Sequence, residues 1–374
     1  MADTVGDWLA LVHALYPPAH AASWDSVGLQ VGDPVWSVER VLVSLDVTIG
    51  VIEEATEDAT PTLVLAHHPL LFRPLERLTP DTASGATALA AARAHVAVAA
   101  AHTNLDVAGD GAGTSDPVAR LLELVDVAPL TSELQDSSRI KLVTFVPPHH
   151  TEAVLDALAE AGAGTIGEYE RCSFRVGGTG TFRPREGTAP HSGEVGSDNA
   201  EEEDRLEMKV PRESVGRVVR ALLTAHPYEE VAYDLVPLFD RADVGFGRVG
   251  TLPQPLPLRA LAARIRDDLP APHLRFAGNP DALVRGVAVV GGAGDSLIGA
   301  ALAAGVDVYV TGDLRHHVTL DALERGLALI DAGHHATEVA ALPAWIERLR
   351  GEASARGLTA EVVRSRTPTD PWSG

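Results

Sequence analysis

The hydrophobic positions at the start of the chain follow a helical period. Apolar side chains recur from Trp8 to Leu15, Asp3 or Thr4 is placed to cap the helix, and Pro17 ends it. From Arg40 onward, short apolar runs alternate with helical stretches. Such alternation favours a mostly parallel sheet covered by helices. The apolar runs read VLVSLDV, TLVLA and VAVAAAH, with helices expected near residues 51–58 and over ALAAARA.

The middle of the chain has a different pattern. Between about residues 141 and 240, the order of strand, helix, strands, helix and strand is that of a small split βαβ sandwich. Residues 184–204 join its two halves. They are rich in Gly, Pro, Ser and acidic residues, so we expect a mobile surface loop there. After residue 245 the alternation of buried strands and helices returns.

This distribution predicts a discontinuous core with an insertion. The expected fold class is α/β: a two-lobed core with a mostly parallel sheet, interrupted by an inserted α+β module of the ferredoxin-like kind. The predicted domains are residues 1–135 for the first segment of the core, 136–240 for the inserted module, and 241–374 for the second segment of the core.

Composition narrows the classes of function. The 374 residues include 52 acidic and 30 basic side chains, and the net charge of -22 opposes general binding to nucleic acids or anionic membranes. The single cysteine, Cys172, cannot form an intrachain disulfide, and the first residues lack the basic end and apolar block of a secretory signal. The alanine-rich residues 83–101 carry Arg93 and His95, so they indicate a helix and a strand rather than a membrane span. We therefore expect a cytoplasmic protein.

Histidines gather where buried strands end. In open α/β sheets the functional crevice lies beyond the carboxyl ends of the strands, so residues at these positions are candidates for chemistry. The strand-end residues are His67 and His68 after TLVLA, His102 and Asp106 after VAVAAA, Asp313, His316 and His317 after VYVTG, and His334, His335 and Glu338 after LALIDAG. A further pair, His149 and His150, follows two prolines in the inserted module and is expected at a helix entry.

These residue types together are a metal-ligand set. Imidazoles and carboxylates bind zinc, iron, manganese, cobalt or nickel, and one carboxylate can bridge two ions. A set of three imidazoles and two carboxylates drawn from these strand ends is too large for one tetrahedral site. Such a set suits two ions about 4 Å apart with bound water. A single histidine pair in a loop is more often solvated surface. Four strand-end clusters at one predicted edge favour the metal site over that alternative.

A resemblance to a known family supports this interpretation. Across nearly the whole chain, seven strings in register resemble the NGG-interacting-factor-three-like dinuclear-metal proteins, whose members are often named GTP cyclohydrolase 1 type 2 homologues. The inserted segment, which ends in AHPYEEVAYDLVPL, is similar to the extra module of longer bacterial members and to small trimeric signalling and copper-tolerance folds. The strings are WDSVGLQVGD, VLVSLDVT, LVLAHHPLLF, AAHTNLDVA, VAVVGGAGDSLI, VYVTGDLRHH and LIDAGHHATE.

The resemblance implies a toroidal homohexamer with two divalent metal ions per subunit facing an internal cavity. Position by position, it implies that the metal ligands are His67, His68, Asp106, His334 and Glu338, with Glu338 as the bridge. It places His102, Asp313 and His317 around the metals or facing the substrate. The glycine loop after Asp106 and the long loop of the inserted module depart from the family pattern. These departures leave the implied ligands intact.

Two glycine-rich segments are weaker signals. Residues 109–113 precede a helix whose free N–H groups suit a phosphate, or they form a flexible connection. Residues 291–296 follow a strand and open a helix, but they lack the dinucleotide spacing and a P-loop lysine, so tight turn packing explains them better. A nucleotide or another phosphorylated small molecule is the partner that the resemblance and the first segment suggest.

Two hypotheses for the function follow. The first is a metal-dependent hydrolase that uses a metal-activated water, with His102 or His317 as the candidate proton carrier and GTP as the substrate that the family label suggests. The second is a non-catalytic assembly for metal handling or regulation, in which the inserted module acts as a gate or sensor.

Overall fold

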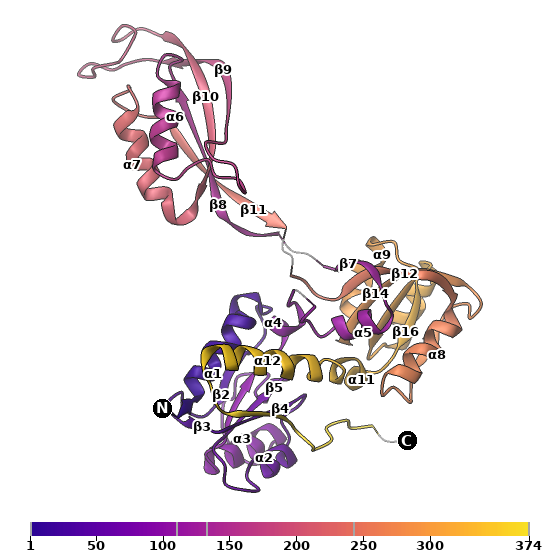
Figure 1. Cartoon of the computed structure of the whole chain (residues 1–374). Coiled ribbons are helices and arrows are strands. Elements are labelled where there is room, and N and C mark those ends of the chain that lie inside the picture. Colours follow the sequence, from indigo (N-terminus) through magenta and orange to yellow (C-terminus); the bar gives the residue numbers. More distant parts are fainter. Residues whose placement is uncertain (1, 110, 132–133, 242–243, 373–374) are drawn as a thin grey trace. The chain divides into compact units, whose positions relative to one another are not determined.

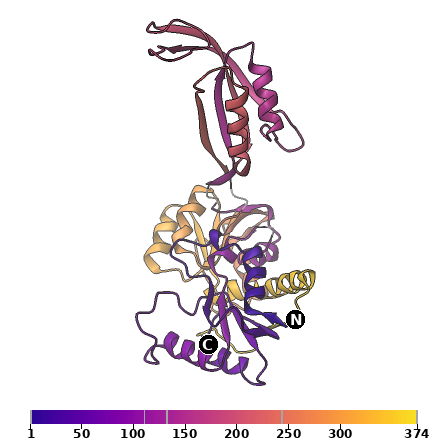
Figure 2. The same ribbon diagram turned by 90° about the vertical axis from the view of Figure 1, so that its left-hand side faces the viewer.

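The computed structural model describes residues 2–109, 111–131, 134–241 and 244–372 (Figures 1 and 2). Contacts between Cα atoms divide the chain into two compact units. Unit 1 comprises residues 1–132 and 243–374, and unit 2 comprises residues 133–242. The boundaries expected from the sequence, after residues 135 and 240, lie a few residues from these limits. No helix in the described part of the chain is both long and apolar enough to span a membrane.

Unit 1 opens with helix α1 (Val5–Leu15). Thr4 caps this helix: its hydroxyl accepts a hydrogen bond from the Asp7 backbone, and the Asp7 carboxylate accepts one from the Thr4 backbone. The other expected cap, Asp3, instead accepts hydrogen bonds from the backbone N–H groups of Thr359 and Ala360, each over 2.7 Å. The first helix is thereby tied to the last segment of the chain.

The first lobe of unit 1 is built on a five-stranded sheet. Its order is β17-β4-β5-β6-β2, and all neighbours are parallel except the edge pair β6 and β2. Helices α1 and α12 cover one face, and α2 and α3 cover the other (Figure 1). The bounds are β2 (Gly28–Val31), β4 (Arg40–Ser44), α2 (Ile49–Ala55), β5 (Thr62–Ala66), α3 (Ala83–Arg93), β6 (Ala97–Ala100), α12 (Leu342–Arg356) and β17 (Glu361–Arg364).

The second lobe of unit 1 contains a six-stranded sheet of order β13-β16-β15-β14-β12-β7. Only the three central strands β14, β15 and β16 run parallel, and the strands on either side of them pair antiparallel. The two lobes confirm a mixed α/β fold, although parallel pairing dominates only the first sheet. The bounds are β7 (Val125–Pro129), β12 (Arg248–Pro257), α8 (Leu258–Asp268), β13 (Arg275–Ala277), β14 (Leu283–Ala293), α9 (Ile298–Ala303), β15 (Val308–Gly312), α10 (His316–Glu324) and β16 (Ala328–Asp331).

Unit 2 is an antiparallel sheet of order β11-β8-β10-β9 with two helices. Helices α6 and α7 lie side by side on one face of the sheet in both views (Figures 1 and 2). Leu142, Leu158, Leu206 and Leu222 are fully buried between the two layers, so this unit has a core of its own. The bounds are β8 (Leu134–Val146), α6 (Thr151–Glu160), β9 (Ser173–Phe182), β10 (Asn199–Pro211), α7 (Val215–Ala225) and β11 (Tyr233–Arg241).

The acidic segment of unit 2 differs from the sequence expectation. The expected loop over residues 184–204 is shorter, because residues 199–204 belong to strand β10. Glu203 pairs there with Gly178 of β9, a strand rich in glycine. A half-exposed strand of this kind keeps alternate acidic side chains in solvent, so acidic composition alone did not distinguish it from a loop. The expected helix entry at His149 and His150 is confirmed, since α6 begins at Thr151.

Candidate metal centre

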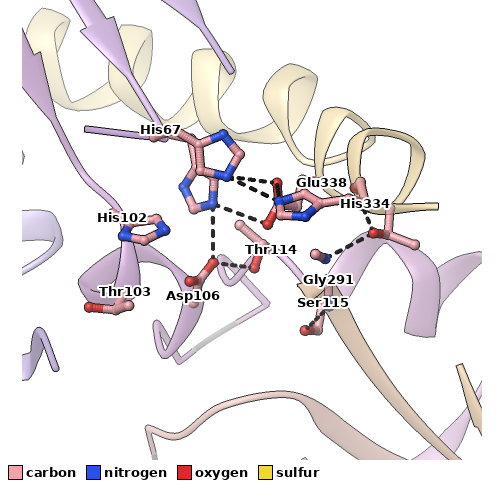
Figure 3. Close-up of polar contacts among 12 residues, drawn as sticks. His67, His102, Thr103, Asp106, Thr114, Ser115, Gly291, His334 and Glu338 are labelled. Carbon is pink, nitrogen blue, oxygen red and sulfur yellow. Dashed lines mark hydrogen bonds and ion pairs between the residues drawn. The ribbon is translucent and has the colours of Figure 1, made fainter. Parts of the chain in front are cut away.

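The ends of two sheets in unit 1 bring the candidate ligands together. His67 and His68 follow β5, and Asp106 ends the short helix α4 (Thr103–Asp106) that follows β6. From the second lobe, helix α11 (His334–Val339) begins just after β16 and carries His334 and Glu338. Figure 3 shows His67, Asp106, His334 and Glu338 pointing toward one another, and His68 also lies next to Glu338. All five residues that the sequence proposed as ligands therefore lie in one cluster.

Glu338 is the centre of this cluster. Its Oε1 lies 3.5 Å from Nε2 of His67, which is itself 3.5 Å from Oδ1 of Asp106. Its Oε2 lies 3.1 Å from Nε2 of His68 and 3.1 Å from Nε2 of His334. The two oxygens of this one carboxylate thus face two different groups of potential metal ligands. This is the arrangement expected of a carboxylate that bridges two ions.

The Nδ1 atom of each of the three imidazoles already has a hydrogen-bond partner. Nδ1 of His67 lies 3.1 Å from the carbonyl oxygen of Ala101, Nδ1 of His68 lies 2.8 Å from Asp46, and Nδ1 of His334 lies 2.7 Å from Asp313. An Nδ1–H that donates to an oxygen leaves the lone pair of a neutral ring on Nε2. Such a carbonyl or carboxylate partner is typical of histidines that bind metals.

The polar atoms at the centre fit a metal better than they fit one another. Nε2 of His67 and Oε2 of Glu338 are buried without a hydrogen-bond partner in the described part of the chain, and Glu338 is only 4% exposed. A buried carboxylate among imidazoles is costly unless its charge is compensated. The donors are nitrogen and oxygen, without sulfur, which suits zinc, iron, manganese, cobalt or nickel. The buried His and Glu groups could therefore hold metal ions.

The electrostatics of the cluster favour bound positive charge. Burial lowers the pKa of His68, but the neighbouring carboxylates of Asp46 and Glu338 outweigh burial and raise this pKa to about 10. The pKa of His334 is raised to about 9, because Glu338 and Asp313 likewise outweigh burial. Burial raises the pKa of Glu338, yet His67, His334 and His68 together hold it well below its usual value. The carboxylates thus create a negative potential that also attracts metal cations, which would replace the imidazole protons on binding.

One glycine makes room for the central carboxylate. Gly292 lies near the end of β14 and has a positive φ of +71. A Cβ atom at this position would lie 2.1 Å from Oε1 of Glu338. Its N–H also donates a hydrogen bond over 2.9 Å to Thr337, next to Glu338. The glycine string at residues 291–296 therefore serves close packing, as its spacing indicated, and this packing is against the metal centre.

His102 lies beside the cluster, and His317 does not. The His102 ring is 5.1 Å from the His67 ring and 5.5 Å from the His68 ring, and its Nδ1 lies 2.9 Å from the buried carboxylate of Asp25. Burial raises the pKa of Asp25, but hydrogen bonds from His102 and Thr103 outweigh it and hold this pKa far below its usual value. His317 is exposed at the start of α10, where its ring lies 5.1 Å from that of His316.

Of the residues that orient the cluster, Asp313 had been placed around the metals by the resemblance, whereas Asp46, Asp25 and Thr114 were not assigned from the sequence. Asp46 lies in the VLVSLDV string and Asp25 in the WDSVGLQVGD string, so both stood in segments already singled out. Thr114 directly follows the glycine loop at residues 109–113, and its hydroxyl donates a hydrogen bond over 2.6 Å to Asp106. In this loop Asp110 lies outside the described residues, while Arg248 and Arg120 donate to the carbonyls of Ala108 and Gly111.

Comparison with known proteins identifies the family. A model of the Duf34/NIF3 family (NGG1p interacting factor 3) matches residues 4–371. The chain belongs to the DUF34/NIF3 family. A relative from Bacillus subtilis is 39% identical over 98% of this chain and 97% of its own length, and one from Mycobacterium tuberculosis is 40% identical over 100% and 97%. Both DUF34/NIF3 relatives are named GTP cyclohydrolase 1 type 2 homolog.

Two solved structures have the same fold. A Bacillus cereus protein related to NIF3 is 37% identical, with a TM-score of 0.72 over 100% of both chains. The Staphylococcus aureus protein SA1388 is 27% identical, with a TM-score of 0.77 over 99% of this chain and 98% of its own. The resemblance inferred from the seven strings is thereby confirmed.

Proposed function

We propose that this protein is a dinuclear metal-dependent hydrolase. The observation that carries the proposal is the position of Glu338, whose two carboxylate oxygens face separate donor groups. His67, Asp106 and Oε1 of Glu338 would hold one divalent ion. His68, His334 and Oε2 of Glu338 would hold the second. Two such ions, when bound, supply a Lewis acid and lower the pKa of a water enough to make it a nucleophile near neutral pH.

The protein's own contribution is to orient groups and to move a proton. Asp25 holds Nδ1 of His102, so Nε2 of His102 is free to take or give a proton at the edge of the cluster. The buried position of His67 and Glu338 keeps bulk water from competing at the centre. His102 also comes within ligand distance of His67 and His68, so a His102→Asn variant separates its two roles. If His102 acts as the proton carrier, the His102→Asn variant lowers kcat and leaves the metal content unchanged.

The substrate that we propose is a nucleotide or another phosphorylated small molecule, with GTP as the first candidate. The support comes from the names of the relatives, which refer to GTP cyclohydrolase homology. The corresponding reaction is hydrolytic opening of a ring at a carbon–nitrogen bond, for which an activated water and a proton carrier are sufficient.

The test is hydrolysis by the metal-loaded protein against a panel of GTP, other nucleotides and phosphoesters. A Glu338→Gln variant should lose both activity and metal. The matched control is Glu347→Gln, which makes the same chemical change at an exposed residue of α12 and should behave as wild type. A fully metal-loaded wild-type protein that hydrolyses no member of the panel would refute the proposal.

A metal-handling role is the second candidate. It is favoured by the exposure of the site, because His68 and His334 also line a cavity of about 1030 Å³ that is open to solvent. Ions held for transfer would pass to a modest chelator within minutes, whereas ions held for catalysis would be retained. Rapid release without hydrolysis would therefore select this role over the first.

We also propose that the protein is a cytoplasmic homohexamer, as the family resemblance implies. A single free cysteine, Cys172, is consistent with a reducing compartment. Light scattering should give the mass of six copies of the 39.3-kDa chain. A monomeric mass in the metal-loaded protein would contradict the hexamer.

A further inference from the structure

A cavity beside the metal centre has an aromatic wall. Trp24 and Phe72 leave 60% and 48% of their surface exposed, although large aromatic side chains are usually well buried. Their ring centroids lie 5.6 Å apart, and each lies 6.1 Å from the ring of His102. Trp24, Phe72 and His102 therefore form one aromatic surface, here called the aromatic wall.

The aromatic wall lines a cavity of about 420 Å³. Phe246, Val290 and Leu297 of the second lobe line the same cavity, and so do His334 and Glu338 of the metal centre. This volume lies in the range of small-molecule sites, which combine apolar surfaces with a few converging polar groups. The cavity thus offers a ligand aromatic and aliphatic surfaces beside the reactive centre.

We propose that this cavity binds its ligand through a planar heteroaromatic ring stacked on the aromatic wall, and that Trp24 and Phe72 determine this specificity. The inference rests on the proposed function, because the ring belongs to the substrate of the metal centre. An exposed indole offers a wide flat surface to any planar ring, whereas a sugar or an aliphatic chain gains far less from it.

Polar groups in the same cavity suit the edge of such a ring. The hydroxyl of Ser115 accepts a hydrogen bond from the Gly291 backbone over 3.1 Å, which leaves its own O–H free to donate. Ser296 is exposed and also lines the cavity. Ring nitrogens and carbonyl oxygens are acceptors for these hydroxyls. A heteroaromatic ring therefore uses both the flat surface and the hydroxyl groups.

The experiment is equilibrium binding to the metal-loaded full chain by calorimetry, with three probes. Guanosine monophosphate and cytidine monophosphate carry a ring, and ribose 5-phosphate carries the same sugar and phosphate without one. We expect both ring-bearing probes to bind at least about tenfold more tightly than ribose 5-phosphate. Trp24→Ala should remove most of this difference, Phe72→Ala should reduce it, and Trp24→Phe should keep most of it.

The control is Tyr169→Ala, which removes an exposed aromatic side chain of unit 2. It should leave the affinities for all three probes unchanged. Equal affinity for the three probes, no binding of the ring-bearing probes at millimolar concentration, or unchanged affinities in Trp24→Ala would each overturn the inference. A change of assembly mass in Trp24→Ala with unchanged ring binding would instead identify the wall as a contact between copies. Because no turnover is needed, a protein that binds rings but hydrolyses nothing would contradict only the proposed hydrolase.

Discussion

The imidazoles of the centre are oriented by groups that would not themselves touch a metal. Asp46 and Asp313 each hold one nitrogen of a histidine ring, so the other nitrogen faces Glu338. A carboxylate partner also makes the ring a stronger base and hence a stronger ligand. At the scale of residues, the affinity for metal ions should therefore depend on Asp46 and Asp313 as well as on the ligands themselves.

Asp313→Asn tests this dependence. Asn keeps the shape of the side chain and tolerates the positive φ of residue 313, but it removes the charge that supports His334. We expect the affinity for one metal ion to fall roughly 10- to 100-fold, measured by competition with a chelator. Asp321→Asn, an exposed change on α10, is the control and should leave affinity unaltered. Equal affinities in both variants would show that Asp313 has no part in metal binding.

Gly292→Ala tests the packing against Glu338. The added methyl group must displace the carboxylate and also strains a positive φ. We expect metal affinity to fall by at least about tenfold and the metal-free protein to lose about 1–2 kcal/mol of stability. Gly299→Ala in α9 meets no neighbouring atom and should be neutral or stabilising. Metal content and melting temperature measure both effects, and a fully loaded Gly292→Ala protein would refute the packing argument.

At the scale of elements, strand ends explain what the sequence could and could not predict. His67 and Glu338 were predictable as candidates because each comes after a buried parallel strand, β5 or β16, and functional residues gather beyond the carboxyl ends of such strands. The sequence placed them at one sheet edge, whereas the two strands belong to different sheets. The partner of His102 was not predictable, since Asp25 lies 77 residues away in a loop. Gly292 was assigned to a turn, because its contact with Glu338 exists only when β14 and α11 of the second lobe pack together. Local patterns identify which residues are exposed at an edge, but not which residues meet there.

A second element-level contact joins α2 to the segment after β17. Glu54 is only 8% exposed and accepts hydrogen bonds from Ser365, Arg366 and Thr367. Burial alone would raise the pKa of Glu54, but these bonds outweigh it and lower the pKa to about 2. Since this is below the ordinary value of 4.5, ionised Glu54 stabilises the fold above about pH 4.5. That contribution is lost as the pH falls toward 2.

Glu54→Gln should therefore destabilise the metal-free protein by about 1–3 kcal/mol at pH 7, and the difference from wild type should shrink between pH 4.5 and 3. Urea unfolding in the presence of a chelator measures it at each pH. Glu57→Gln removes only an exposed ion pair with Arg366 and should cost less than about 0.5 kcal/mol. A pH-independent difference would contradict the role assigned to the carboxylate charge.

At the scale of the whole molecule, the metal centre belongs entirely to unit 1, and unit 2 has its own core. The chain enters unit 2 through β8 and leaves through β11, and these strands pair directly, with Leu134 opposite Arg241. Neighbouring antiparallel strands lie about 5 Å apart, so a short linker can replace the unit. The two units should therefore be separable.

Replacing residues 133–242 by a short Gly-Ser linker should leave a folded protein that binds as much metal per chain as the full chain. The isolated residues 133–242 should show the circular dichroism of a folded α+β protein without added metal. Loss of metal binding in a folded, linker-joined unit 1 would show that unit 2 contributes to the centre.

Metal stoichiometry shows whether Glu338 bridges two ions. The metal-free protein is titrated with Zn²⁺ and Mn²⁺ in parallel, and bound metal per chain is measured after removal of the excess, for wild type, Glu338→Gln and Glu347→Gln. Two ions per chain in wild type and in Glu347→Gln, with one or none in Glu338→Gln, is the result predicted for a centre bridged by Glu338. Two ions per chain in Glu338→Gln, or none in wild type with either metal, would contradict it.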